Sequence, residues 1–263
     1  MRLYWEVVRR SFARHLTYRA AAVAGLLTNF FFGLLRLSVL LALYGQRQAV
    51  EGYSVADIIG YTVLTQAVLT YLSLFGWYEL MEAVYTGEVA THLTKPLGLL
   101  QFWLAQDLGR ALVGLLLRGV LLVLLFELFF DLAYPETAVQ RLGLAAAVAL
   151  SWLLSFAWRF LINLPAFWSP NARGIIRFGF VISWFFSGFL MPLRFLPAWV
   201  QQVAAWTPFP HLVNTVFDVY AGVLQGPALL GALAWQAAWS AALLVVGQLV
   251  LKTAVRRLVI LGG

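Results

Sequence analysis

The chain has 263 residues, of which 62% are hydrophobic and 11% charged, and its net charge is +7 at pH 7. Soluble domains carry about 25% charged residues, so this composition excludes an ordinary soluble domain and predicts an integral membrane protein. The basic residues stand between apolar runs, which is typical of positive charge flanking membrane spans and argues against a nucleic-acid partner. The absence of cysteine excludes disulfides and thiolate metal sites.

The first 19 residues are predicted to form an amphipathic helix, residues 1–19. Apolar residues recur at helical spacing from Trp5 to Leu16, and Arg10 and Arg14 fall roughly opposite them. Such a helix is expected to lie in the interface of the inner leaflet, with its arginines at anionic head groups of membrane lipids. The alternative is that these arginines are only orientation signals.

Six apolar segments are long enough to cross a bilayer, which takes about 20 helical residues. They are Ala20–Tyr44, Asp57–Tyr78, Leu104–Phe130, Leu142–Leu164, Ile175–Leu193 and Pro227–Leu251. Most lysines and arginines flank the ends of these spans on one side, whereas the other side has only Arg47, Arg141 and Arg194. Since cytoplasmic loops are enriched in Lys and Arg, both termini are predicted to be cytoplasmic.

The loop after the second span, about residues 79–96, reads ELMEAVYTGEVATHLTKP. Leu80, Met81 and Val84 suit a short amphipathic helix that ends near Gly87. Glutamates and Tyr85 are expected on its exposed side. This pattern favours a docking element for a partner protein, and the alternative is an ordinary solvated loop.

Three basic or acidic residues lie inside apolar runs: Arg36 in the first span, and Arg118 and Glu127 in the third. Each costs about 2.5–3.5 kcal/mol at the centre of a membrane helix, so each is expected to face protein or water. Two interpretations stay open, a polar lining for a substrate and a buried bridge that fixes helix packing, with Arg36 and Glu127 as the candidate pair. Arg159 is expected to extend toward the head groups.

The stretch from Ser187 to Val223 is apolar but contains four prolines, so it does not form one continuous helix. Pro192 and Pro197 are expected to break the fifth span, and two short helices are expected to follow. Non-helical backbone at membrane depth persists only where protein or a water-filled cavity covers it. The hypothesis is a re-entrant outer segment at about residues 190–222, and the alternative is an outer loop without a role in transport.

Catalytic and cofactor motifs are absent from the sequence. The three histidines do not fall in a metal-binding pattern, and no nucleophile motif or pair of intramembrane aspartates occurs. There is no phosphate-binding loop of the form G-x-x-x-x-G-K-[ST]. We therefore expect no catalytic, cofactor or metal site on this chain, and if ATP powers the protein, another polypeptide binds it.

The order and spacing of two segments carry a family resemblance. The pattern from Glu82 to Pro96, with Gly87-Glu88 and Lys95-Pro96, resembles the first cytoplasmic loop of permeases of the type-2 ABC exporter (ABC-2-type transporter) family. The segment Ser187–Val223 resembles the family's connection between the fifth and sixth spans. There the first segment contains a coupling helix that sits in a cleft of a separate ATPase subunit, and the second forms short re-entrant helices that cap the translocation path.

The resemblance implies roles for residues at the matching positions. The residues expected to contact the ATPase are Glu82, Val84, Tyr85, Gly87 and Glu88, and those expected at the outer gate are Pro192, Pro197, Trp199, Pro208 and His211. It further implies that ATP and Mg²⁺ bind the partner ATPase subunits, that a second permease chain, identical or related, completes the path, and that the location is the bacterial plasma (inner) membrane.

The sequence thus predicts an all-α, six-span permease with one transmembrane domain, residues 20–263, that exports an amphiphilic, lipid-like or hydrophobic drug-like substrate. Two classes of alternative function stay open. One is a membrane-embedded enzyme acting on lipid or peptide, and the other is an ion-coupled secondary transporter, which calls for broken helices and acidic groups near the midplane.

Overall fold

The computed structural model describes residues 2–257, and nearly all of its regular structure is helical. The helices are α1 Arg2–Thr17, α2 Arg19–Tyr44, α3 Val55–Leu72, α4 Glu79–Tyr85, α5 Val89–Leu93, α6 Leu99–Val113, the π-helix η1 Gly114–Gly119, α7 Val120–Glu127, α8 Ala138–Asn163, α9 Arg173–Phe186, α10 Ala198–Ala205, α11 Asn214–Tyr220 and α12 Gly226–Ala254. Single 3₁₀ turns are η2 Leu164–Phe167, η3 Leu193–Phe195, η4 Phe209–His211 and η5 Val255–Arg257. Two-residue strands, β1 Ala49–Val50 and β2 Tyr53–Ser54, pair as an antiparallel hairpin.

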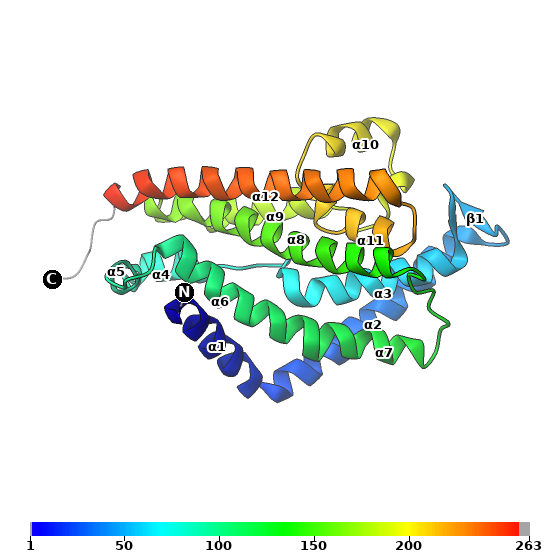
Figure 1. Ribbon diagram of the computed structural model, residues 1–263, viewed down its shortest axis with the longest axis horizontal. Helices are drawn as coiled ribbons and strands as arrows, with labels where there is room; N and C mark the ends of the chain where they lie inside the picture. The colour runs from blue at the N-terminus through cyan, green and yellow to red at the C-terminus, as the bar shows by residue number, and fades with distance from the viewer. Residues whose placement is uncertain (1, 258–263) are drawn as a thin grey trace.

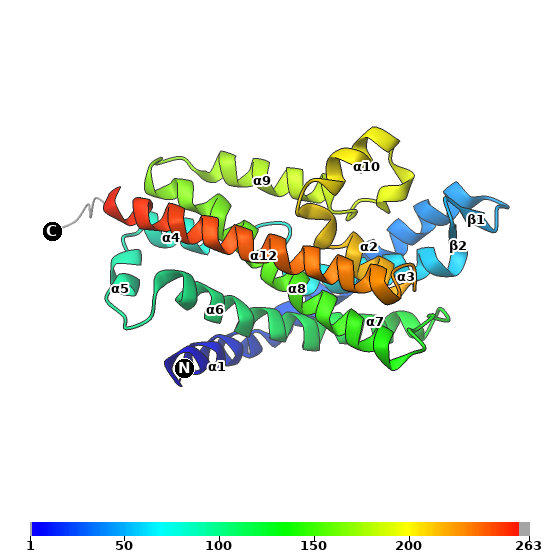
Figure 2. The ribbon, with the colours of Figure 1, turned by 45° about the horizontal axis from the view of Figure 1, so that its top comes forward.

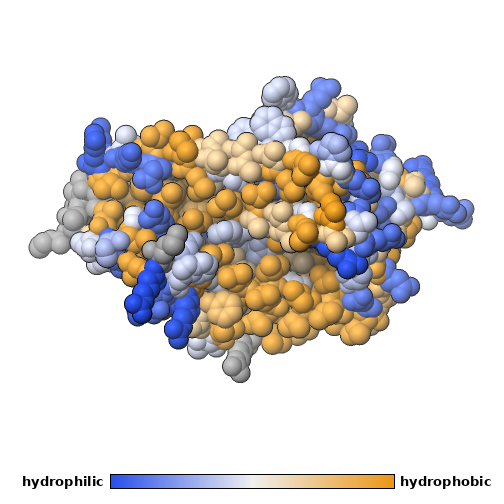
Figure 3. Space-filling model, in the orientation of Figure 1, coloured by the Kyte–Doolittle hydropathy of each residue, from blue (hydrophilic) through white to orange (hydrophobic). Residues whose placement is uncertain are grey.

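The long helices run broadly along the longest axis of the molecule (Figure 1). One end, called the inner end here, holds α1, α4, α5 and the last turns of α12; the other, the outer end, holds the hairpin and the loop between α7 and α8 (Figures 1 and 2). Apolar side chains cover most of the middle of the face in Figure 3, and hydrophilic ones gather toward both ends. This distribution is that of an all-α membrane protein.

Five helices are long and apolar enough to cross a membrane: Ala20–Tyr44, Val55–Leu72, Leu99–Glu127, Ala138–Phe167 and Gly226–Arg257. The predicted fifth span corresponds to α9, which has 14 residues. At 1.5 Å per residue α9 is about 21 Å long, shorter than the hydrocarbon core of about 30 Å. The structure therefore agrees with an all-α membrane protein, and the count of six spans stays a prediction.

Two predicted spans end earlier than the sequence indicated. The second was expected to reach Tyr78, but α3 ends at Leu72, where Ser73 adopts a left-handed conformation with φ of 54°. The fifth was expected to end at the prolines, but α9 ends at Phe186, because Gly188 turns the chain with φ of 75°. A left-handed residue is a common way to end a helix, and glycine adopts it without strain.

Local sequence explains where two helices begin at the outer end. The Ser54 hydroxyl accepts a hydrogen bond from the Asp57 amide at 3.1 Å, and the Asp57 carboxylate accepts one from the Ser54 amide at 2.8 Å. Thr137 and Gln140 form the same reciprocal cap at the start of α8. Such capping boxes satisfy amide groups that the first turn of a helix leaves without partners.

Helices α6, η1 and α7 form one long interrupted helix beside α3. A Cβ atom at Gly114 would overlap the carbonyl oxygen of Thr70 in α3, so the two backbones approach more closely here than side chains allow. The π-helical turn begins at this same glycine. Close contacts of this kind through small residues are typical of helix packing in membranes.

Candidate functional site

The inner-end turn α4–α5 has one buried side and one exposed side. Leu80, Met81 and Val89 are buried against a cluster that includes Phe156 and Phe160 of α8. Glu82 and Glu88 are exposed, whereas Val84 is half-buried and packs on the same cluster. The structure therefore presents acidic residues outward while the apolar face anchors the turn to the membrane helices.

Gly87 lies at the corner between α4 and α5. Its φ is 75°, and a Cβ atom built there would meet nothing within 4 Å. The turn therefore requires glycine for its backbone conformation, while the space around it is open in this chain. That open corner is where another molecule can approach the backbone.

Tyr85 is not a freely presented side chain. Its ring is partly exposed, but its hydroxyl donates to the Ser169 carbonyl at 2.8 Å and accepts from the Ala172 amide at 2.7 Å. Glu82 approaches Arg173 at 3.8 Å. The inner connection between α8 and α9 thus forms one surface with α4, a relation that sequence spacing did not reveal.

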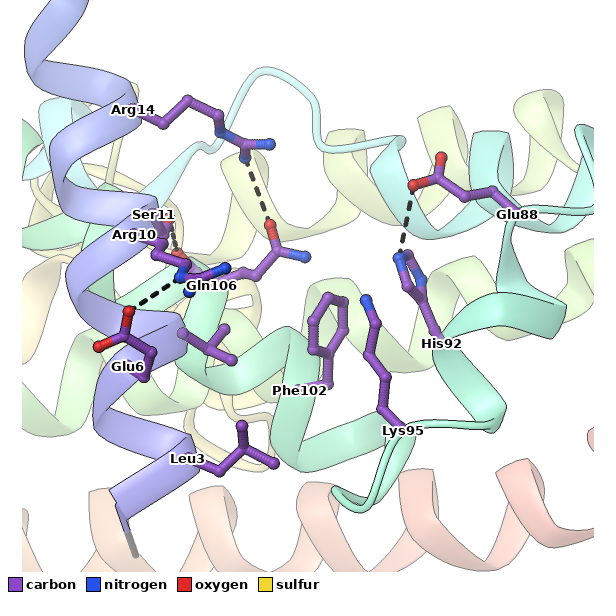
Figure 4. Close-up of a pocket in the computed structure, with 11 residues that line it drawn as sticks. Leu3, Glu6, Arg10, Ser11, Arg14, Glu88, His92, Lys95, Phe102 and Gln106 are labelled. Atoms are coloured by element: carbon purple, nitrogen blue, oxygen red, sulfur yellow. Dashed lines mark hydrogen bonds and ion pairs between the residues drawn. The ribbon is translucent and has the colours of Figure 1, made fainter.

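A groove of about 520 Å³ at the same end is lined by residues of α1, α5 and α6 (Figure 4). Arg14 donates to the Gln106 side chain at 3.3 Å, and the Lys95 ammonium lies 4.1 Å from the centre of the Phe102 ring. Val8 of α1 is buried, whereas Trp5 is exposed. Helix α1 therefore packs on the protein through one part of the apolar stripe that the sequence indicated.

The inner half of the helix bundle contains a buried cluster of charges. Asp107 of α6 accepts hydrogen bonds from Arg110 at 2.8 Å, from the Trp152 indole at 2.9 Å, and from Arg159 of α8 at 3.0 and 2.8 Å. The side chains of Asp107 and Arg159 are each 1% exposed. A carboxylate and two guanidinium groups at this depth are stable only because they pair with one another.

This cluster corrects the prediction for Arg159, which was expected to extend toward the head groups. Its guanidinium instead points into the protein and also bonds Ser155 at 3.1 Å. The signal available in the sequence was the spacing of Asp107 and Arg110, which places both on one helix face. Sequence alone did not indicate that α6 packs against α8, so Arg159 was not recognised as part of the cluster.

The linker between α3 and α4, residues 73–78, is held by side chains from three helices. Arg110 donates to the Tyr71 carbonyl at 2.8 Å, Ser155 to Leu72 at 2.9 Å and Asn163 to Trp77 at 3.0 Å. The Trp184 indole donates to the Leu74 carbonyl, and the Asn163 oxygen accepts from the Met81 amide at 3.3 Å. These side chains thus hold the end of α3, the start of α4 and two carbonyls of the linker between them, those of Leu74 and Trp77.

Those contacts connect the inner-end turn to the charge cluster. Arg159, Ser155 and Asn163 all lie on α8, at intervals of four residues. One helix face therefore holds both the carboxylate of α6 and the polypeptide that leads into α4. A displacement of α4 cannot occur independently of α8 without breaking these hydrogen bonds.

The outer segment forms two 3₁₀ turns and two short helices, and prolines precede all of these elements except α11. Pro192, Pro197 and Pro208 stand immediately before η3, α10 and η4. Trp199 is 63% exposed, whereas α11 is buried among the spans. His211 bonds Thr215 at 2.9 Å, and its carbonyl accepts from Gln236 of α12 at 2.8 Å, so it lies in the packing between the segment and α12.

Asn214 ties the two ends of this segment together. Its backbone amide donates to the Ser187 carbonyl at 3.0 Å, and its side-chain oxygen accepts from the Leu193 amide at 3.2 Å. Asp218, one turn later, accepts from Tyr53 of the outer hairpin at 2.8 Å. The non-helical backbone after α9 thus finds these partners within the protein.

The intramembrane residues do not pair as expected. Arg36 donates to the Tyr61 hydroxyl at 2.8 Å, to Thr65 at 3.5 Å and to the Phe189 carbonyl. Arg118 donates to the Thr70 carbonyl at 3.0 Å, and Glu127 is exposed near the end of α7. The Arg36–Glu127 pair was therefore wrong, because polar groups of α3 and the chain after α9 lie closer to Arg36. Within residues 2–257, no group of three acidic or histidine side chains is arranged to hold a metal ion.

Five apolar membrane-length helices with polar ends define an integral membrane protein with multiple spans. Residues 30–262 match the family model described as ABC-2 family transporter protein, and the chain therefore belongs to the ABC-2 transporter family. This match confirms the family expected from the sequence and identifies a permease subunit of an ABC transporter, a class of membrane transport subunit that associates with ABC ATPases. Comparisons with curated proteins and with solved structures found no match.

Proposed function

We propose that this chain is the permease of an ATP-driven exporter and that its α4–α5 turn docks a cytoplasmic ATPase subunit. The observation that carries the proposal is the corner at Gly87, with open space at its Cβ position and the exposed acidic residues Glu82 and Glu88 beside it. The turn stands at the inner end, where Lys and Arg are concentrated, so the positive-inside rule supports a cytoplasmic position there. Residues 258–263, which include the C-terminus, lie outside the described residues.

The complex contains two permease chains and two ATPase chains, since one permease offers too few helices to enclose a path. The ATPases bind ATP and Mg²⁺, and their closure moves the two α4–α5 turns. Because α8 holds both the linker to α4 and, through Arg159, the Asp107 carboxylate of α6, that movement reaches the membrane helices as a joint displacement of α8 and α6. The outer segment from Ser187 to Val223 closes the path on the opposite side. The location that fits is a bacterial inner membrane with cytoplasmic termini.

The docking role is tested with two glycine variants. Gly87→Trp fills the open corner of the turn, whereas Gly45→Trp places the same side chain at the outer end, at a glycine with φ of 55° and nothing within 4 Å of its Cβ position. Both substitutions place a side chain at a backbone position with positive φ. In reconstituted complexes we expect Gly87→Trp to abolish both ATPase association and substrate-stimulated hydrolysis. The proposal is wrong if Gly87→Trp couples as well as Gly45→Trp does.

A further inference from the structure

A cavity of about 600 Å³ lies between α2, α3 and the chain that follows α9. Its walls include Phe32, Phe75 and Phe189, and its polar lining includes Asn29, Gln66 and Arg36. Small-molecule sites are typically cavities of about 300–1,000 Å³ with mostly apolar walls and a few polar groups. This cavity has that composition, and its one charged lining group is an arginine.

The contacts of Arg36 leave its positive charge without a counter-ion. Its three hydrogen-bond acceptors are the Tyr61 hydroxyl, the Thr65 hydroxyl and the Phe189 carbonyl, all of them neutral. The ion pairs found among residues 2–257 involve four other arginines and one histidine, and none includes Arg36. The guanidinium also lies 5.1 Å from the Tyr61 ring centre and 5.0 Å from that of Phe189.

Neutral acceptors and aromatic faces hold a guanidinium in place but compensate its charge only in part. A guanidinium carries five N–H donors, and the three hydrogen bonds of Arg36 leave two of them for a ligand. The Asp107 cluster shows the contrast, because there a carboxylate accepts directly from two arginines. An anion entering the cavity would compensate the charge of Arg36 in the same way.

We propose that this cavity binds an amphiphile with an anionic head group, a carboxylate or a phosphate, whose head pairs with Arg36 and whose apolar part lies against the phenylalanine walls. The proposal rests on the proposed transport function, for which it supplies the charge class of the substrate. A carboxylate or phosphate matches the planar fork of an arginine, which gives the strongest class of hydrogen bond in a site with little water. A neutral or cationic amphiphile of the same length lacks this partner.

The test measures binding to the purified permease alone in phosphatidylcholine nanodiscs, with empty nanodiscs as background. The probes are dansylaminoundecanoic acid, the corresponding undecyl phosphate and the neutral undecanoic amide, detected by energy transfer from tryptophan. Trp184 lies near this cavity, with its ring centre 5.1 Å from that of Phe75. We expect one or both anionic probes to bind at least about tenfold more tightly than the amide, the preference that a charge-assisted hydrogen bond gives. The two anionic probes separate carboxylate from phosphate ligands.

Variants separate a ligand role of Arg36 from its role in packing. Arg36→Gln is expected to lower the affinity for the anionic probes to that for the amide, with amide binding unchanged, and Arg36→Lys is expected to keep the preference. Arg47→Gln, an exposed arginine just beyond the end of α2, is the control and should behave as wild type. If wild type shows no preference, or if Arg36→Gln weakens all probes equally, the site proposal is wrong. If Arg36→Gln does not fold, two results decide on the proposal: the ratio of anionic-probe to amide affinity in wild type, and whether Arg36→Lys keeps that ratio. The binding assay contains no ATPase, so a failure of this site proposal is distinguishable from a failure of the docking proposal at Gly87.

Discussion

The carboxylate of Asp107 in α6 accepts a hydrogen bond from each terminal nitrogen of Arg159 in α8, at 3.0 and 2.8 Å, with both side chains 1% exposed. This pair fixes the distance between two membrane-spanning helices. The same α8 face holds the linker into α4 through Asn163. The charge cluster and the proposed docking turn are therefore parts of one connected structure.

Asp107→Asn is expected to destabilise the folded permease strongly. The substitution leaves Arg159 and Arg110 buried without their shared carboxylate, and breaking a buried pair from one side typically costs about 3–5 kcal/mol. The measurement is the denaturation midpoint of the purified chain in mild detergent. Glu136→Gln, which removes an exposed carboxylate in the loop between α7 and α8, is the control. A midpoint for Asp107→Asn equal to that of the control would contradict a structural role for the cluster.

Asn163→Ala is expected to loosen the linker before α4. The change leaves the Trp77 carbonyl without this donor and the Met81 amide without this acceptor, and an unsatisfied buried group costs about 1–3 kcal/mol. Hydrogen exchange of the Trp77–Tyr85 backbone should therefore accelerate, since exchange reports local opening. Asn171→Ala, at an exposed asparagine of the neighbouring inner loop, should leave that exchange unchanged. Equal protection in both variants would show that Asn163 does not hold the linker.

Much of the fold followed from hydropathy and charge. The centres of all five membrane-length helices lie within about four residues of those of the predicted spans, and α2 begins and ends almost where expected. Bilayer thickness sets the length of a membrane-spanning helix directly, so the length of an apolar run is enough to predict the span. The end of α3 was missed by six residues, because Ser73–Tyr78 is apolar enough to continue a span. In the structure Ser73 turns the chain, and the Leu74 and Trp77 carbonyls bond side chains of other helices.

The candidate site was only partly predictable. The turn at Gly87 follows from a local rule, since glycine ends helices in the left-handed conformation. The partners that were missed lie far away in sequence: Tyr61 is 25 and Phe189 is 153 residues from Arg36, Asp107 is 52 from Arg159, and Ala172 is 87 from Tyr85. Such pairs depend on which helices pack together, which one sequence does not specify. For that reason Arg36 was matched with the wrong partner, and Arg159 was placed at the head groups.

The imidazole of His92 is expected to make the inner end sensitive to acid. Burial of the ring and the nearby Lys95 lower the pKa of His92 below 6.5, and these effects outweigh the opposing one of Glu88. The unfolded state therefore binds the proton more readily, so stability is full above the unfolded pKa of about 6.5 and falls as the pH drops below it. We expect the thermal midpoint to fall on acidification below that pH. His92→Phe, with its ring beside Phe102, should reduce this fall, whereas the control His15→Phe should retain it. An undiminished fall in His92→Phe would assign the effect to another group.

Gly109 is expected to determine how α1 packs on α6. A Cβ atom at this position would lie 2.5 Å from the Val8 carbonyl oxygen and 2.8 Å from the Phe12 amide nitrogen, so any side chain pushes the α1 backbone away. Gly109→Leu should also weaken the hydrogen bond from Ser11 to the Gln106 carbonyl, 2.6 Å long in the native chain. The arginines of α1 are already exposed in the native chain, but a helix that packs less tightly opens locally more often. Brief trypsin treatment of the detergent-solubilised protein should therefore release N-terminal peptides faster. Gly231→Leu is the matched control, because Gly231 is also within a helix but a Cβ atom there meets nothing within 4 Å. If trypsin releases these peptides at the same rate from both variants, α1 does not depend on the close approach at Gly109, and its position is set by the membrane surface instead.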